Sequence, residues 1–231
     1  MEIKILGVCG SPVKKGNVEI YLEHLLKSCE EMGNGTVKTE LVSLQGKELR
    51  DCIHCNWCMR KQSEGKFCNQ SDYMQELYPK LLECDALVLA SPAYFLRITG
   101  RMANFLDRMR PLMEGNYYKY SMADKVGAAA VVAWFRNNGL ELTATTILLP
   151  MIGLGMFVIA PPFELGALAA NALSSEHGMG KFDPKERYGV LKDEYGLKAN
   201  RGLAKKLVEK TRLIKAGKEA LKSIEPVQAI E

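Results

Sequence analysis

The stretch "IKILGVCGSPVKKGNVEIYLEHLLKSCEEM", residues 3–32, contains the pattern that decides the fold. Residues 3–8 form a short, mostly apolar run of the kind found in buried strands. Residues 17–32 carry apolar side chains at the spacing of one helix face. A polar loop joins the two segments. The stretch therefore predicts a strand, a loop and a helix, which is the unit from which parallel sheets are built.

The same unit recurs along the chain. A strand that alternates polar and apolar residues is predicted at 37–44, and further apolar strands at 85–91, 125–134 and 155–161. Helices are predicted at 72–84, 99–113, 140–153 and 196–224. Near-continuous apolar strands separated by helices indicate a parallel sheet that is covered on both faces. We therefore expect an α/β fold with a doubly wound five-stranded parallel sheet, in the flavodoxin-like order 2-1-3-4-5. The expected domain organisation is a single domain, 1–231, with a cysteine-rich loop after the second strand, 44–72, and an irregular insertion before the last helix, 162–196.

Composition supports a folded cytoplasmic protein. Hydrophobic residues make up 47% of the 231 residues, which is ample material for one core. The net charge is +4, without a long block of Lys or Arg, so neither a nucleic-acid partner nor an anionic membrane surface is expected. No uninterrupted apolar run reaches the roughly 18 residues of a membrane span, and no secretory leader is expected. Thiols should then stay reduced.

The loop "CGSPVKKGN", residues 9–17, follows the first strand and opens a helix. In doubly wound sheets, ligands bind outside the carboxyl ends of the strands. Ser11 can supply a hydroxyl group, Gly16 gives the backbone freedom, and Asn17 can cap the helix. Helix N-termini favour anions, so the loop is a candidate phosphate site. It matches neither a Walker loop nor a GxGxxG fingerprint, and the alternative is an ordinary turn with a good cap.

Two further loops should share this edge of the sheet, and the loop after the second strand should lie close by. "SPAYFLRITG", residues 91–100, brings Pro92, Tyr94 and Phe95, whose rings can flank a planar ligand. "AWFRNNGLELT", residues 133–143, brings hydrogen-bond donors and a turn glycine, namely Arg136, Asn137, Asn138 and Gly139. Each loop alone is compatible with a core aromatic or a solvated turn. Together the three loops predict a ligand with a phosphate and a planar ring.

Four cysteines crowd the stretch "DCIHCNWCMRKQSEGKFC", residues 51–68. Cys52, Cys55 and Cys58 are separated by two residues each, and Cys68 follows after nine more. In a cytosolic chain such a cluster indicates metal or redox chemistry. Three closely spaced thiolates with a fourth favour a [4Fe–4S] cluster. A zinc site, which usually needs two separated CxxC pairs, and a reversible disulfide are the alternatives.

The sequence resembles a known family. "GSPVKKGNVE", "SPAYFLRITGRMANFLDR" and "FRNNGLELT" are similar to the three FMN-binding loops of the NADPH-dependent FMN reductase group of flavodoxin-like proteins. "CIHCNWC…GKFC…DYM" resembles the cysteine segment of the iron–sulfur flavoprotein branch of that group. "YGVLKDEYGLKANRGLAKKLVE" resembles the start of the branch's last helix. The resemblance spans nearly the whole chain.

The resemblance implies specific cofactor contacts. It implies an FMN phosphate bound by Ser11, Lys14, Gly16, Asn17 and Val18, and an isoalloxazine ring against Pro92, Ala93, Tyr94, Phe95, Phe135, Arg136, Asn137 and Gly139. It also implies a [4Fe–4S] cluster on Cys52, Cys55, Cys58 and Cys68. Val18 stands where the family usually has threonine or serine, Phe135 replaces a smaller residue, and the gap before Cys68 is longer than usual.

The expected function is that of an FMN-dependent oxidoreductase that couples two-electron flavin chemistry to a one-electron cluster. We expect ferredoxin or NAD(P)H as the electron donor, and no catalytic acid–base residue. The resemblance implies a homodimer or homotetramer in which the cluster of one subunit approaches the flavin of another, with 162–196 and 116–122 as candidate contact regions. The alternatives are a cluster-free NAD(P)H-dependent FMN or quinone reductase, a thiol redox sensor without turnover, and a phosphate-ligand binding protein with structural zinc.

Overall fold

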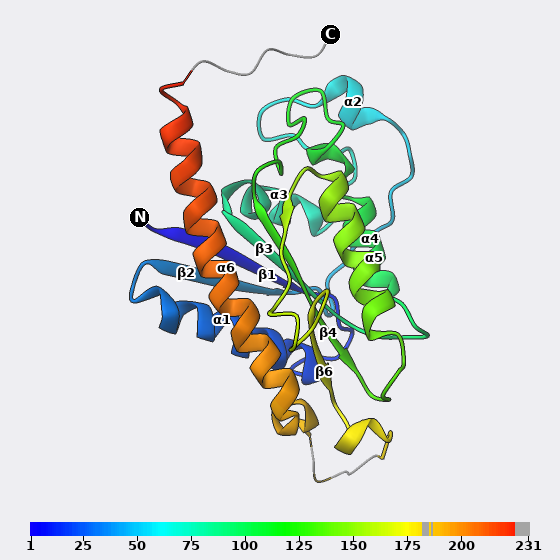
Figure 1. Cartoon of the computed structure of the whole chain (residues 1–231). Coiled ribbons are helices and arrows are strands. Elements are labelled where there is room, and N and C mark those ends of the chain that lie inside the picture. Colours follow the sequence, from blue (N-terminus) through cyan, green and yellow to red (C-terminus); the bar gives the residue numbers. More distant parts are fainter. Residues whose placement is uncertain (182–184, 186, 225–231) are drawn as a thin grey trace.

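The computed structural model describes residues 1–181, 185 and 187–224 (Figure 1). Its parallel sheet runs in the order β2-β1-β3-β4-β5, and a sixth strand, β6, also pairs with β4. The strands are β1 Ile3–Cys9, β2 Val37–Ser43, β3 Ala86–Pro92, β4 Val126–Ala133, β5 Phe157–Val158 and β6 Ala170–Leu173. The predicted doubly wound, flavodoxin-like order is therefore confirmed.

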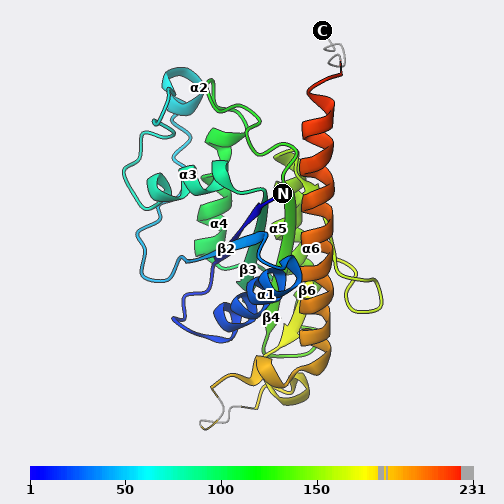
Figure 2. The same cartoon turned by 90° about the vertical axis from the view of Figure 1, so that its left-hand side faces the viewer.

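Helices cover both faces of the sheet. The helices are α1 Asn17–Gly33, α2 Trp57–Lys61, α3 Met74–Glu83, α4 Gly100–Asp107, α5 Leu140–Gly153 and α6 Glu194–Leu221, with short 3-10 turns η1 Arg110–Leu112, η2 Glu176–Gly178 and η3 Gly189–Lys192. Helices α1 and α6 pack on one face, whereas α3, α4 and α5 pack on the other (Figure 2). Among the described residues, no helix combines the length and the apolar character that crossing a membrane requires.

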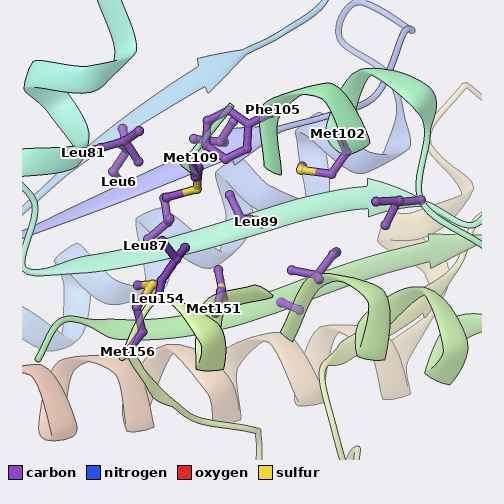
Figure 3. Packing of buried hydrophobic residues seen from close by; sticks show 14 of the residues in the cluster. Leu6, Leu81, Leu87, Leu89, Met102, Phe105, Met109, Met151, Leu154 and Met156 are labelled. Carbon is purple, nitrogen blue, oxygen red and sulfur yellow. The ribbon is translucent and has the colours of Figure 1, made fainter. Parts of the chain in front are cut away.

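Strand β3 shows why the sheet is buried on both sides. All seven of its residues are buried. Leu87 and Leu89 point into the cluster that contains Phe105 of α4 (Figure 3). Val88 belongs to the opposite cluster, with Leu22 of α1. Because successive side chains of a strand point to opposite faces, a strand with helices on both sides is mostly apolar.

The fifth strand differs from its prediction. A strand was expected over 155–161, but β5 pairs with β4 only through Phe157 and Val158. The chain then leaves the sheet and returns as β6, which pairs with the far end of β4, from Ala130 to Ala133. Pro161 and Pro162 explain the interruption, because proline has no N–H group to donate to a strand ladder.

The predicted helix at 99–113 also ends early. Helix α4 stops at Asp107, and the chain continues through the 3-10 turn that contains Pro111. A proline ring clashes with the carbonyl four residues earlier, so a regular helix cannot continue through this position. The insertion predicted at 162–196 contains β6, η2 and η3. Its residues 182–184 and 186 lie outside the described part of the chain.

Candidate functional site

The loop after β1 presents an uncapped helix N-terminus. The N-cap of α1 is Gly16, and no side chain accepts a hydrogen bond from the first turn. Ser11 is buried, and its Oγ accepts a hydrogen bond from the Val13 N–H at 3.2 Å. First-turn amides without an intrahelical acceptor are donors for an anion, and Lys14 beside them adds a positive charge.

Asn17 does not cap this helix, contrary to the prediction. Its Oδ1 accepts a hydrogen bond from the Val190 N–H at 3.0 Å, and its Nδ2 donates to the Arg187 carbonyl at 3.4 Å. Asn17 therefore ties the segment before α6 to the start of α1. This contact brings Arg187 to the same pocket as Lys14.

The loop after β3 is a tight, strained turn. Tyr94 and Arg97 exchange two backbone hydrogen bonds, Tyr94 N to Arg97 O at 2.9 Å and Arg97 N to Tyr94 O at 3.1 Å. Phe95 and Leu96 between them both have positive φ, at 47° and 66°. Bulky residues rarely adopt this region, and such strain concentrates at ligand clamps. The Phe95 side chain is 96% exposed at the tip.

Gly139 lets the loop after β4 approach this turn. Its φ is +82°, and a Cβ at this position would lie 2.5 Å from the Leu96 Cα. The two ring-flanking loops thus touch backbone to backbone. The predicted need for a tight turn at Gly139 is confirmed, because a left-handed φ is easily adopted only by glycine.

Backbone hydrogen bonds join the segment 170–180 to the loop after β4. Ser174 N donates to the Ala133 carbonyl at 2.8 Å, and Arg136 N donates to the Gly178 carbonyl at 2.8 Å. The rings of Trp134 and Phe135 stack at 6.5 Å between centroids. This part of the insertion therefore builds the site within its own chain.

These loops enclose a pocket of about 740 Å³ at the carboxyl edge of the sheet. The predicted FMN residues that line it are Ser11, Lys14, Gly16, Asn17, Val18, Pro92, Ala93, Tyr94, Phe95 and Phe135. The predicted residues that do not line it are Arg136, Asn137 and Gly139. The pocket is also lined by residues that were not predicted, including Val13, Lys15, Trp134, Ser174 and Arg187. Asn138, which was expected only as a hydrogen-bond donor of this edge, lines it too.

Arg136 faces elsewhere. It lines an adjoining pocket of about 820 Å³, and its Nε donates to the His177 carbonyl at 3.2 Å. Its expected contact with a ring in the first pocket stays a prediction. Trp134 and Asn138 stand in the same quoted loop and were detectable from the sequence. Ser174 and Arg187 were not, because they reach the pocket only through β6 and the Asn17 contact.

The chain after β2 runs along α4 to the opposite end of the molecule. Arg101 Nη1 donates to the carbonyls of Leu44 and Lys47 at 2.8 and 2.6 Å. Asn104 Nδ2 donates to the Leu49 carbonyl at 3.1 Å. One helix face thus holds the turn at 44–47 and the residues that follow it, up to 50, because residues three or four apart on a helix lie on one side. The cysteines that follow emerge beyond the far end of α4.

Cys52, Cys55, Cys58 and Cys68 line one small cavity of about 20 Å³. All four are free thiols; Cys58 is buried and Cys55 is exposed. Burial raises the pKa of the Cys58 thiol, and the positive charge of Arg110 opposes that shift. Within the described residues, no three His, Cys, Asp or Glu side chains converge closely enough to hold a single metal ion.

Hydrogen bonds and ring stacking fix the chain around the cysteine cavity. The buried Gln62 donates from Nε2 to the Phe67 and Pro111 carbonyls at 3.2 and 3.1 Å. The Phe67 ring stacks on Tyr118 with centroids 4.4 Å apart, and Asn116 N donates to the Cys58 carbonyl at 3.0 Å. The segment 116–122, expected at a subunit contact, therefore packs against the cysteine loop of its own chain.

Two buried polar atoms without a partner belong to this cavity. Among the described side chains, Asn56 Oδ1 and Arg108 Nε are buried without a hydrogen-bond partner, and both residues line the cysteine cavity. Buried polar atoms are nearly always satisfied, so such orphans need an explanation. A group with acceptor atoms between the cysteines would pair with the Arg108 Nε–H donor. Asn56 Oδ1 is an acceptor and would need a donor instead.

The two cavities share no lining residue. The first lies at the lower edge of the sheet in Figure 1, where β4 and β6 end, and the cysteine loop with α2 lies at the top. The expectation that the loop after the second strand lies close to the other three loops is therefore wrong within one chain, since the face of α4 carries it away.

A family model described as NADPH-dependent FMN reductase matches residues 3–167. The chain belongs to this family. As a member of the NADPH-dependent FMN reductase family, it is an FMN-dependent oxidoreductase. The pocket agrees with this assignment, because an uncapped helix start, two lysines and flanking aromatic rings provide for a phosphate and a planar ring.

Relatives of this FMN reductase family member carry a narrower name. An iron-sulfur flavoprotein of Methanocaldococcus jannaschii is 34% identical over 92% of this chain and all of its own length. An iron-sulfur flavoprotein of Methanosarcina thermophila is 31% identical over 73% of this chain and 83% of its own. Crystalline RosB, solved with a bound flavin phosphate intermediate, has a TM-score of 0.69 at 18% identity, covering 99% of this chain and 90% of its own. The last similarity supports the fold.

Proposed function

We propose that this FMN-dependent oxidoreductase binds FMN in the pocket at the carboxyl edge of the sheet and a [4Fe–4S] cluster between Cys52, Cys55, Cys58 and Cys68. The observation that carries the proposal is the meeting of all four cysteines on one cavity, with the unpaired Arg108 Nε–H donor on its wall. The names of two relatives, both iron-sulfur flavoproteins, support it. Because Cys55 is exposed, the loop can widen around a cluster without unpacking the core.

The residues of the flavin pocket would bind and orient FMN. The first-turn amides of α1, Ser11 and Lys14 would hold the phosphate. Pro92, Tyr94 and Phe135 would flank the ring and exclude water from it. FMN supplies two-electron chemistry that can also proceed in single-electron steps, which suits exchange with a cluster. The electron donor is a pyridine nucleotide or a reduced ferredoxin.

A second copy of the chain would complete electron transfer. The outer face of α5 exposes Leu142, Leu149 and Ile152, which are 55%, 60% and 56% exposed and spaced by seven and three residues. Such an apolar stripe is a candidate subunit interface. A two-fold axis perpendicular to α5 would set the flavin edge of one copy beside the cysteine edge of the other, because the two helices would run antiparallel.

Iron and acid-labile sulfide analysis after anaerobic purification tests the cluster. We expect near four irons and four sulfides per chain, together with flavin absorbance. Cys68→Ala should lose most of the iron and keep FMN, whereas Cys84→Ala, a buried cysteine outside the cavity, should keep both. Zinc, or no metal in the unmodified protein, would contradict the proposal and favour structural zinc or a thiol-only enzyme.

Solution mass tests the interface. The unmodified protein should elute as a dimer or a larger even-numbered assembly in chromatography with light scattering. Leu149→Glu should shift it toward the monomer, because a buried unpaired charge is costly. Leu213→Glu, which alters an exposed leucine on α6, serves as the matched control. Equal behaviour of both variants would place the interface elsewhere.

A further inference from the structure

Arg108 is an unusual arginine, fully buried at the end of α4. Its side chain is 1% exposed, and it binds a carboxylate, Asp72, that is fully buried. Nη1 donates to Asp72 Oδ2 at 2.6 Å and Nη2 donates to Oδ1 at 3.1 Å, a two-pronged contact. A buried ion pair is weak evidence for a stabilising role, because apolar replacements of similar size are often as stable. The pair invites a functional explanation.

The pair joins the two ends of the cysteine segment. Asp72 Oδ2 accepts a hydrogen bond from the Arg50 N–H at 2.9 Å. Arg108 Nη1 donates to the Arg50 carbonyl at 3.1 Å. Residues 50 and 72 are thereby held at one point, and the four cysteines lie on the loop between them. The geometry of that loop therefore depends on this pair.

Arg108 also reaches a cysteine sulfur. Its Nη2 lies 3.6 Å from the Cys68 Sγ, within hydrogen-bond distance for sulfur. It lines the cavity, and its buried Nε has no partner among the described residues. Arg110 lines the same cavity, but its described hydrogen bonds go to Glu114 Oε2 and Met59 Sδ. Of these two arginines, Arg108 is therefore the one with a described hydrogen bond to a cysteine sulfur.

We propose that Arg108 is a positioning residue that fixes Cys68 as the fourth cluster ligand and makes the cluster easier to reduce, an inference that rests on the proposed cluster. Uptake of one electron from a reductant adds one negative charge to the thiolate-held cluster and forms or breaks no bond. An N–H group aimed at a ligand sulfur stabilises the more negative state. Asp72 balances the guanidinium charge, so the effect comes from the directed N–H groups rather than from a net cation.

The test is a redox titration of the purified holoprotein, with dithionite as reductant and the EPR signal of the reduced cluster as the readout. Two variants disrupt the contact. Arg108→Lys keeps the charge but loses the planar guanidinium that binds Asp72 and the sulfur together. The double change Arg108→Met with Asp72→Asn removes the donor, leaves no unpaired buried charge and keeps an acceptor for Arg50 N. Arg101→Met is the matched control, because it removes an arginine of the same helix face that binds carbonyls and no sulfur.

In both Arg108 variants, the equilibrium constant for reduction of the cluster should fall at least tenfold. For one electron, this lowers the reduction potential by at least 59 mV. The potential of Arg101→Met should stay unchanged. Loss of iron from the Arg108 variants alone, with FMN and far-UV spectra retained, also supports the positioning role. Unchanged potentials in fully loaded variants, or an equal shift in Arg101→Met, would overturn it. An iron-free unmodified protein would instead refute the proposed function before any variant is compared.

Discussion

Gly139→Ala offers a sharp test of how the flavin pocket is built. Gly139 opens α5 with a φ of +82°, and an added Cβ would lie 2.5 Å from the Leu96 Cα and 3.0 Å from its carbonyl carbon. These are backbone atoms, so no side-chain rotation can relieve the clash. The turn that carries Tyr94 and Phe95 has to move away from the loop that carries Phe135.

The expected magnitude follows from those contacts. Ordinary contact begins near 3.4 Å, so the turn must retreat by about 0.9 Å. Displacements of that size at a binding or reacting centre cost up to about 100-fold. We expect FMN to bind about 10- to 100-fold more weakly, or about 1.4–2.8 kcal/mol. The left-handed φ adds roughly 1–2 kcal/mol of destabilisation to the fold.

Titration of the apoprotein with FMN, followed by quenching of flavin fluorescence, measures the affinity. Gly35→Ala is the matched control, because its φ is +78° and no atom lies within 4 Å of the added Cβ. Gly35→Ala should lower the free energy of unfolding by a similar amount, because its φ is also left-handed, and it should keep the affinity for FMN. If both variants bind FMN as tightly as the unmodified protein, the contact between these loops does not shape the pocket and the reasoning fails.

Three further predictions concern charge and packing. Lys14→Gln should weaken FMN binding several-fold at low salt and leave riboflavin binding unchanged in the same titration, because riboflavin lacks the phosphate. Phe105→Ala, in the core beneath β3, should lower the free energy of unfolding by about 3–5 kcal/mol in urea. Burial acts to raise the pKa of Asp72, but hydrogen bonds from Arg108 and Arg50 outweigh it and hold the pKa below its ordinary value. The stabilisation of the fold by ionised Asp72 should therefore be complete above about pH 4–5 and disappear as the pH falls through that lowered pKa. When the pH is lowered below 4, the urea midpoint measured by circular dichroism should decrease, and it should decrease less steeply in Asp72→Asn.

Local patterns were sufficient for the central sheet. The strands around Leu87 and Val131 are predicted within one or two residues, because a strand buried on both faces is nearly continuously apolar. The short strand β6 was not predicted. Its four residues lack a distinctive pattern. They form a strand because β4 continues beyond its short pairing with β5, and its residues Ala130 to Ala133 pair with them.

Contacts between distant segments explain the errors in the site. Asn17 has the residue type of a helix cap, but Val190 and Arg187 compete for its side chain from 173 and 170 residues away. Arg136 belongs to a loop rich in donors, but the carbonyl of His177 holds its Nε. A single sequence reveals which groups can bond, whereas the fold decides which of the possible partners is near.

The position of the cysteine loop shows the same limit and carries the largest consequence for mechanism. A loop after β2 begins at the carboxyl edge, so proximity to the other loops was the natural expectation. Arg101 and Asn104 of α4, with Arg108 directly after it, override this expectation. Their side chains bind successive carbonyls of residues 44–50 and lead that segment along the helix. Strand β4 alone has eight residues, which span roughly 26 Å. Electron transfer weakens steeply with distance, so a flavin at one edge and a cluster beyond the other would exchange electrons efficiently only between two copies. The apolar stripe on α5 is the surface that we propose for bringing those edges together in two antiparallel copies.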